Sequence, residues 1–175
     1  MDLNADFFDL LGLPRRFRLA AGELDSRYRE LQARVHPDRF ASAPEAERRL
    51  SMQWASQANE AYRTLKKPLA RAGYLIELAG VDLRAETNTA MPADFLMQQM
   101  EWREAVQEAR SAGDHHELEH LHHRLQADIA GRYEQIAVWL DEDADYLAAA
   151  DGVRRQMFLE KLLLEIEDAL AALEE

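Results

Sequence analysis

A histidine and an aspartate lie on either side of a proline in the sequence His36-Pro37-Asp38. Proline lacks a backbone N–H and fixes its φ angle, so it ends a helix, and it disfavours helical geometry in the residue before it. We therefore expect a helix to stop here, which would leave the imidazole and the carboxylate at the tip of a helix–loop–helix. The plain alternative is a helix end that Asp38 merely caps.

The same pair could act as a general acid and base, with Asp38 orienting the imidazole of His36. No nucleophile lies near the pair in the sequence, and the chain has no glycine-rich phosphate loop. An enzyme that depends on this pair stays a remote alternative, and we predict no catalytic residue.

A second group of candidate ligands is the stretch 115–123, which holds five of the 6 histidines. His116, His120 and His123 fall at helical positions i, i+4 and i+7, a spacing that can bind zinc or nickel. The competing interpretation is an exposed helix start that happens to be rich in histidine. We favour that interpretation, so a metal-binding protein is a second remote alternative.

Three aspartates, Asp141, Asp143 and Asp145, resemble the start of a calcium-binding loop. Such a loop needs glycine at its sixth position and glutamate at its twelfth, where this chain has Tyr146 and Gly152. The chain also lacks cysteine, which excludes disulfides and thiolate metal sites. We therefore predict no metal and no cofactor.

The composition indicates a folded, helix-rich chain, because the 175 residues include only 7 Gly and 5 Pro. No apolar run reaches the roughly 18 residues of a membrane span, and the N-terminus lacks the pattern of a signal peptide. We therefore expect a cytoplasmic protein.

The formal net charge of −12 is unevenly distributed along the chain. Residues 1–78 carry 13 Lys/Arg and 11 Asp/Glu, whereas residues 79–175 carry 8 and 22, which gives +2 and −14. This asymmetry suggests two parts with different partners. It argues against nucleic acid as the main partner, since phosphate binding needs a basic surface.

Helical periodicity predicts the elements that must position these residues. In the first part it predicts helices at 6–13, 21–35 and 45–66 and a fourth from Pro68 to about Gly80. The third helix is expected to bury Leu50, Trp54, Ala61 and Leu65 on one face.

A polar linker is predicted at residues 79–91. Helices at about 92–110, 115–140 and 145–173 follow it, and together they predict a three-helix bundle. The last helix is expected to bury Leu159, Leu163, Ile166 and Leu170, with Phe158 beside them. Nothing in the sequence has the pattern of a strand, so the fold class is all-α.

The first helix of this bundle has two distinct faces. Residues Phe95, Trp102, Val106 and Ala109 recur at helical spacing and form an apolar stripe. A second set of residues lies on roughly the opposite side of the helix and comprises Met97, Met100, Glu101, Glu104 and Glu108. Leu96 borders this set. Exposed methionines and acids would suit a docking surface for a basic partner, although a wide bundle core could bury the same methionines.

With its flanking helices, the His-Pro-Asp motif resembles the J domain of DnaJ-type co-chaperones, and the whole chain is similar to the HscB family. The first motifs that carry the resemblance are Phe7-Phe8-Asp9-Leu10-Leu11-Gly12-Leu13-Pro14, His36-Pro37-Asp38-Arg39-Phe40-Ala41-Ser42 and Asn59-Glu60-Ala61-Tyr62-Arg63-Thr64-Leu65. Further motifs are Arg71-Ala72-Gly73-Tyr74-Leu75, Phe95-Leu96-Met97 and Phe158-Leu159-Glu160-Lys161-Leu162.

The resemblance implies an L-shaped co-chaperone that is not itself an enzyme, with a J domain at 1–78 and a C-terminal client-binding domain at 92–175. Its J domain would dock on the DnaK-type ATPase HscA and stimulate ATP hydrolysis. Its C-terminal domain would bind the iron–sulfur scaffold IscU. The implied HscA-docking residues are His36, Pro37, Asp38, Arg27, Arg34 and Arg39. The implied IscU-binding residues are Leu96, Met97, Met100, Glu101, Glu104, Glu108 and Phe158.

A J-protein that serves a different client is the main alternative. The second helix also carries Glu23, Asp25 and Glu30, so it is less basic than in many J domains. We expect from this a modest affinity for the chaperone.

Overall fold

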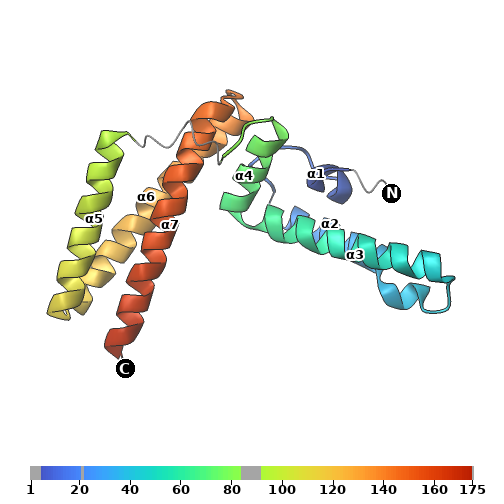
Figure 1. Cartoon of the computed structure of the whole chain (residues 1–175), viewed down its shortest axis with the longest axis horizontal. Helices are drawn as coiled ribbons and strands as arrows, with labels where there is room; N and C mark the ends of the chain where they lie inside the picture. The colour runs from blue at the N-terminus through green and yellow to red at the C-terminus, as the bar shows by residue number, and fades with distance from the viewer. Residues whose placement is uncertain (1–4, 21, 84–91, 175) are drawn as a thin grey trace. The chain divides into compact units, whose positions relative to one another are not determined.

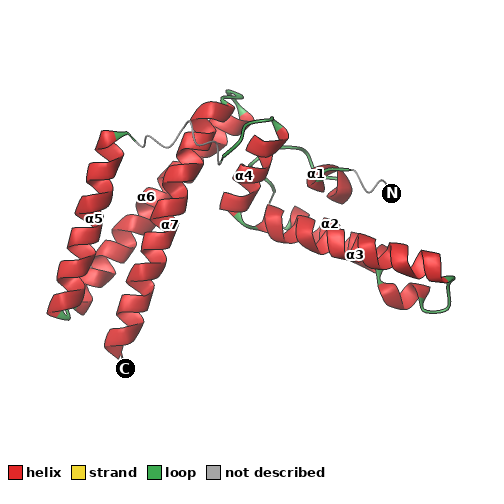
Figure 2. Ribbon diagram, viewed as in Figure 1, coloured by secondary structure: helices red, strands yellow, loops and turns green. Residues whose placement is uncertain are grey.

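The computed structural model describes residues 5–20, 22–83 and 92–174, and every regular element in them is helical (Figure 1, Figure 2). This confirms the all-α prediction. The elements are α1 (Phe7–Leu11), α2 (Glu23–Val35), the 3₁₀ helix η1 (Pro37–Phe40), α3 (Glu45–Lys66), α4 (Pro68–Leu78), α5 (Ala93–Ala112), α6 (His115–Asp141) and α7 (Tyr146–Glu174).

The chain forms two compact units, Met1–Leu75 and Ile76–Glu175. The division falls inside α4. Residues 84–91, which make up most of the predicted linker, lie outside the described residues.

The first unit is anchored by aromatic contacts between α1 and α4. The side chain of Asp6 accepts hydrogen bonds from the backbone N–H groups of Phe8 and Asp9 and so caps α1, and Gly12 ends the helix at a φ of 65°. The rings of Phe7 and Tyr74 stack with centroids 4.5 Å apart, and the Phe7 N–H donates to the Tyr74 hydroxyl at 3.0 Å. The two helices are thereby fixed side by side.

An antiparallel hairpin of α2 and α3 forms the rest of this unit (Figure 1). The apolar stripe predicted for α3 is buried, with one exception. Leu50 is 43% exposed. The reason is that α2 ends at Val35, so the first turns of α3 lie beside the short helix η1 rather than beside α2. Buried residues of the two stripes are Leu24, Leu31, Val35, Trp54, Ala58, Ala61 and Leu65.

Polar side chains also hold the hairpin together. The Asn59 side-chain oxygen accepts hydrogen bonds from the Tyr28 hydroxyl at 2.7 Å and from Gln32 at 2.5 Å. The Tyr28 and Tyr62 rings stack with centroids 4.1 Å apart. We call Tyr28, Gln32, Asn59 and Tyr62 the hairpin brace. The segment Asn59-Glu60-Ala61-Tyr62 is therefore a structural motif here, because it supplies two brace residues and the buried Ala61.

An ion pair continues this brace at the start of α2. The Asp25 carboxylate accepts hydrogen bonds from Lys66 at 2.6 Å and from the Tyr62 hydroxyl at 3.0 Å. Both bonds favour the charged carboxylate, so the pKa of Asp25 is lowered, with the hydrogen bond from Lys66 as the larger cause.

The second unit has a core shared by α5, α6 and α7. The predicted α5 stripe of Phe95, Trp102, Val106 and Ala109 is buried, which confirms it. The prediction for α7 is wrong by one position in two places. Leu163 and Leu170 are only partly buried, whereas their neighbours Leu162 and Ala169 are buried. Because α7 packs against both α5 and α6, its buried face is wider than one stripe.

Helices α6 and α7 approach each other closely at Gly152. A Cβ added there would lie 2.8 Å from a ring carbon of Trp139 and 3.1 Å from a carbon of Ile136. Glycine is therefore required for packing at this point, in contrast to Gly131 of α6, where an added Cβ meets nothing within 4 Å.

Substitution of Gly152→Ala should therefore destabilise the protein, because the rigid indole cannot move aside cheaply. We expect the free energy of unfolding to fall by about 1–2 kcal/mol, since overpacking outweighs the gain in helix propensity. Urea unfolding followed by circular dichroism would measure it. Gly131→Ala is the matched control and should stabilise slightly; equal stability of the two variants would contradict the close approach.

Substitution of Asp25→Asn should make stability depend less on pH. The folded pKa of Asp25 lies below its ordinary value of 3.8, so its contribution is complete above pH 3.8 and is lost as the pH falls through the lowered folded value. We expect a lower urea midpoint for the variant near neutral pH and a difference that vanishes in acid. Glu60→Gln, at an exposed carboxylate of α3, should show neither effect.

Candidate functional site

The His36-Pro37-Asp38 turn is built by the proline, as the sequence predicts. Helix α2 ends at Val35, and His36 follows it with a ψ of 128°, which is not helical. Pro37 then begins η1, where its missing N–H costs nothing. The His36 Nδ1 accepts the backbone N–H of Asp38 at 3.3 Å. His36, rather than Asp38, is thus the capping residue.

The carboxylate of Asp38 is left available for a partner. Its side chain is 90% exposed, and the His36 Nδ1 lies 3.6 Å from the carboxylate. A carboxylate held in a stiff turn loses little conformational entropy on binding. This arrangement suits a charge-assisted hydrogen bond to an arginine of another protein.

Arg39 has a structural contact in addition to its predicted role. Its guanidinium donates to the carbonyl of Ala33 at 2.8 Å, so it caps the C-terminal end of α2. The side chain therefore helps to hold the turn that it flanks.

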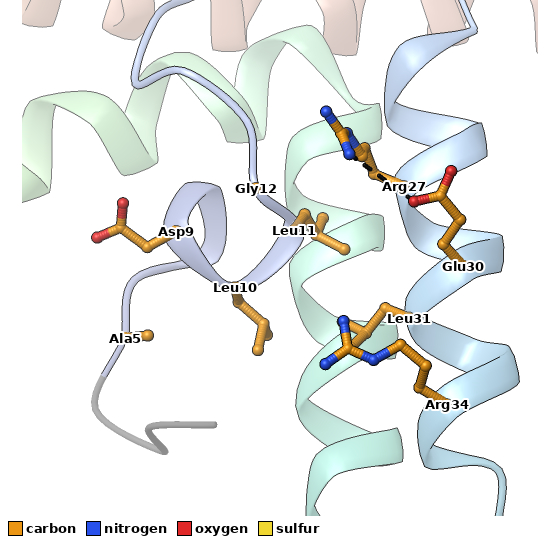
Figure 3. Close-up of a pocket in the computed structure, with 9 residues that line it drawn as sticks. All are labelled: Ala5, Asp9, Leu10, Leu11, Gly12, Arg27, Glu30, Leu31 and Arg34. Atoms are coloured by element: carbon orange, nitrogen blue, oxygen red, sulfur yellow. Dashed lines mark ion pairs between the residues drawn. The ribbon is translucent and has the colours of Figure 1, made fainter.

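Arg27 and Arg34 reach from α2 toward α1 across a groove (Figure 3). The groove has a volume of about 310 Å³, and Leu10, Leu11 and Leu31 are among its lining residues. The Arg27 guanidinium lies 3.8 Å from the Glu30 carboxylate, which partly offsets its charge.

The charge of this groove is dominated by Arg34. Asp9, which also lines the groove, is paired with Arg15 at 2.6 Å. Arg34 is exposed, and no ion pair joins it to any residue in the described part of the chain. It therefore offers an uncompensated cation beside the turn.

Arg34 also borders a second hollow that sequence reasoning missed. This pocket has a volume of about 270 Å³, and Val35, Phe40, Leu50 and Trp54 contribute to its lining. The only signal in the sequence was that Leu50 has the spacing of a core residue at a level where α2 has already ended.

The two faces of α5 are separated as predicted. Leu96, Met97 and Met100 are 47%, 63% and 71% exposed, while Phe95 and Trp102 are buried. The structure therefore excludes the interpretation in which these methionines belong to the core. Glu101, Glu104 and Glu108 are also exposed on this helix.

Phe158 lies at the seam between α7 and α5. Its ring meets that of Phe95 edge-on with centroids 5.9 Å apart, and the guanidinium of Arg103 lies 5.2 Å from its centroid. Phe158 is partly buried against the core. It is thus brought next to the helix that carries Leu96, as a continuous surface requires.

Three histidines of α6 each lie beside a different glutamate, and the rings of His122 and His123 meet edge-on with centroids 5.9 Å apart. His115, His120 and His122 lie within 4 Å of Glu119, Glu117 and Glu167. Among the described residues, no three His, Asp or Glu side chains are grouped so that they could hold a metal ion. The described helices also include none that is long and apolar enough to cross a membrane.

Comparison with known proteins gives a consistent result over nearly the full length. Residues 91–167 match the family model described as the HSCB C-terminal oligomerisation domain. A co-chaperone protein HscB homolog of Aromatoleum aromaticum is 58% identical over 99% of this chain and 98% of its own. The homolog of Azoarcus sp. is 56% identical over the same shares.

Two solved structures share the fold. Chaperone HscB from Vibrio cholerae superposes with a TM-score of 0.84 at 37% identity, covering 97% of this chain and 99% of its own. Human co-chaperone protein HscB gives a TM-score of 0.86 at 28% identity, covering 95% and 83%. The chain therefore belongs to the HscB family of J-domain co-chaperones.

Proposed function

We propose that this protein binds the iron–sulfur scaffold IscU through its C-terminal unit, delivers it to the DnaK-type chaperone HscA in the cytoplasm, and stimulates ATP hydrolysis by HscA through its J domain. The observation that carries the proposal is that each unit exposes side chains its own fold does not use. These are the Asp38 carboxylate in the first unit and the Leu96, Met97 and Met100 side chains in the second.

The chaperone-docking end combines a stiff anchor with a positive surface. Asp38 would accept a hydrogen bond from an arginine of HscA, while Arg27 and Arg34 attract an acidic surface. Glu30 lies close to Arg27, so much of this attraction depends on Arg34. The modest basicity of α2 predicts a modest affinity for the chaperone.

The scaffold-docking end combines adaptable apolar side chains with acids. Methionine has three rotatable bonds and fills irregular gaps, so Met97 and Met100 can follow the contour of a partner. The carboxylates of Glu101, Glu104 and Glu108 favour a basic partner and disfavour an acidic one. Phe158 extends this surface onto α7.

The proposed role of His36 is structural rather than catalytic. Its Nδ1 already accepts the Asp38 N–H, which orients the turn and occupies the nitrogen nearest the carboxylate. The protein would then act on ATP hydrolysis only through its partner.

Substitution of Asp38→Asn should abolish stimulation of HscA ATPase and leave IscU binding unchanged, because the charge is removed from an exposed turn without altering the second unit. Steady-state ATPase assays and calorimetric titration with IscU would measure the two effects. Asp143→Asn, at an exposed residue between α6 and α7, is the matched control and should change neither. Loss of both activities in Asp38→Asn would mean that the two sites are not separable.

Substitution of Met97→Ala with Met100→Ala should weaken IscU binding by about 2 kcal/mol or more if the two side chains are central anchors. Both are exposed, so stability should not change. Phe158→Ala is a less clean test, because its ring also packs on Phe95.

Met52→Ala is the matched control, since Met52 is 61% exposed on α3 in the other unit. Unchanged IscU affinity in the double variant would place the docking surface elsewhere. No complex between the wild-type chain and IscU would favour a different client and leave the chaperone-docking role intact.

A further inference from the structure

Lys161 is an exposed cation on α7 that the bundle does not use. It is the only lysine after residue 67 in the sequence. No ion pair links it to any residue within the described ranges. A side chain with no partner in its own fold is available to another molecule.

Most arginines of the same bundle are engaged within it, which makes the contrast informative. Arg132 and Arg155 pair with Asp128 and Asp151 at 3.1 and 2.9 Å. The guanidinium of Arg124 lies over the ring of Trp102 at 4.4 Å. Most cations of this acidic unit thus contact residues of the unit itself, whereas Lys161 forms no ion pair there.

Exposed apolar side chains flank Lys161 on the same face of α7. Met157 and Leu164 precede and follow it by four and three residues, so they lie next to it on the helix surface. They are 55% and 59% exposed. The core face of α7 is supplied by Leu159 and Leu162 instead, so neither residue is needed for the bundle.

This group lies level with the methionines of α5. The two helices run in the same direction (Figure 1), and Phe158 is level with Phe95 because their rings are in contact. At 1.5 Å per residue, Lys161 lies about 4.5 Å further along α7, which is the level along the bundle axis at which α5 carries Met97 and Met100.

The charge pattern selects the occupant. A second copy of this chain would bring together two C-terminal parts of formal charge −14, which repel each other. A partner that presents basic groups to the α5 acids and a carboxylate to Lys161 is attracted at both places.

We propose that Lys161, between Met157 and Leu164, is the cationic end of the docking surface and pairs with a carboxylate of the scaffold protein. This inference rests on the proposed function. Acids on α5 and a cation on α7 fix the orientation of the bound scaffold, because the reversed orientation would oppose like charges on both helices.

Charge reversal tests the proposal. Lys161→Glu should lower the affinity for IscU about tenfold, with a weaker effect as salt rises, while Lys161→Arg retains most of the affinity. Stimulation of HscA ATPase by the variant in the absence of IscU should remain at the wild-type level, which shows that the J domain is intact.

Arg110→Glu is the matched control. Arg110 is exposed in the last turn of α5, and no ion pair joins it to a residue that the structure describes. It lies about 18 Å further along the bundle than Lys161. Arg110→Glu makes the same change in net charge as Lys161→Glu. If Lys161 makes a specific contact, the IscU affinity of Arg110→Glu should fall far less than that of Lys161→Glu.

Three outcomes would overturn the inference. Equal losses in the two reversals would show a general charge effect, and unchanged affinity in Lys161→Glu would exclude a contact. If sedimentation velocity shows that the wild-type chain self-associates and Lys161→Glu abolishes this without changing IscU affinity, a second copy is the occupant. The proposed function fails separately, when wild-type IscU binding is absent or Met97→Ala with Met100→Ala has no effect.

Discussion

The hydrogen bonds that Asn59 accepts from Tyr28 and Gln32 join α3 to α2 at the middle of the hairpin. Everything the first unit offers to a partner depends on this junction, because α2 ends at Val35 and η1, which follows it, contains no buried residue. A slip in register would leave these part-buried polar groups without partners, which costs free energy in addition to the lost apolar packing. The brace therefore sets the register that carries Asp38 to the tip.

The charged side chains that are not paired within the fold determine the character of each exposed surface. In the first unit Asp9 is neutralised by Arg15, and Asp25 by Lys66, which leaves Arg34 uncompensated. In the second unit most arginines contact aspartates or aromatic rings. The glutamates of α5 therefore remain available to a partner. The local ion pairs thus decide which charges a partner meets, a result that the net charge of each part only suggests.

The sequence was sufficient for the helices, because apolar periodicity and proline positions determine them directly. It also separated the two faces of α5, since Phe95 and Met97 fall on opposite sides of any helix. It failed where an environment comes from another element. Leu50 has the spacing of a core residue but lies beyond the end of α2. Leu162 is buried in place of Leu163 because α7 packs against two helices. The brace was invisible, since nothing in a sequence says which polar residues will face each other.

Some residues both stabilise the fold and lie on a docking surface, so a loss of binding after their side chains are removed has no single interpretation. Arg39 caps α2 through the Ala33 carbonyl, and Phe158 packs on Phe95. Removing either side chain would loosen the scaffold that presents the neighbouring docking residues, so a binding defect would combine two causes. Asp38 and Met97 have no such second role among the described contacts. Exposure without internal contacts is therefore the physical criterion that separates a docking residue from one that only supports it.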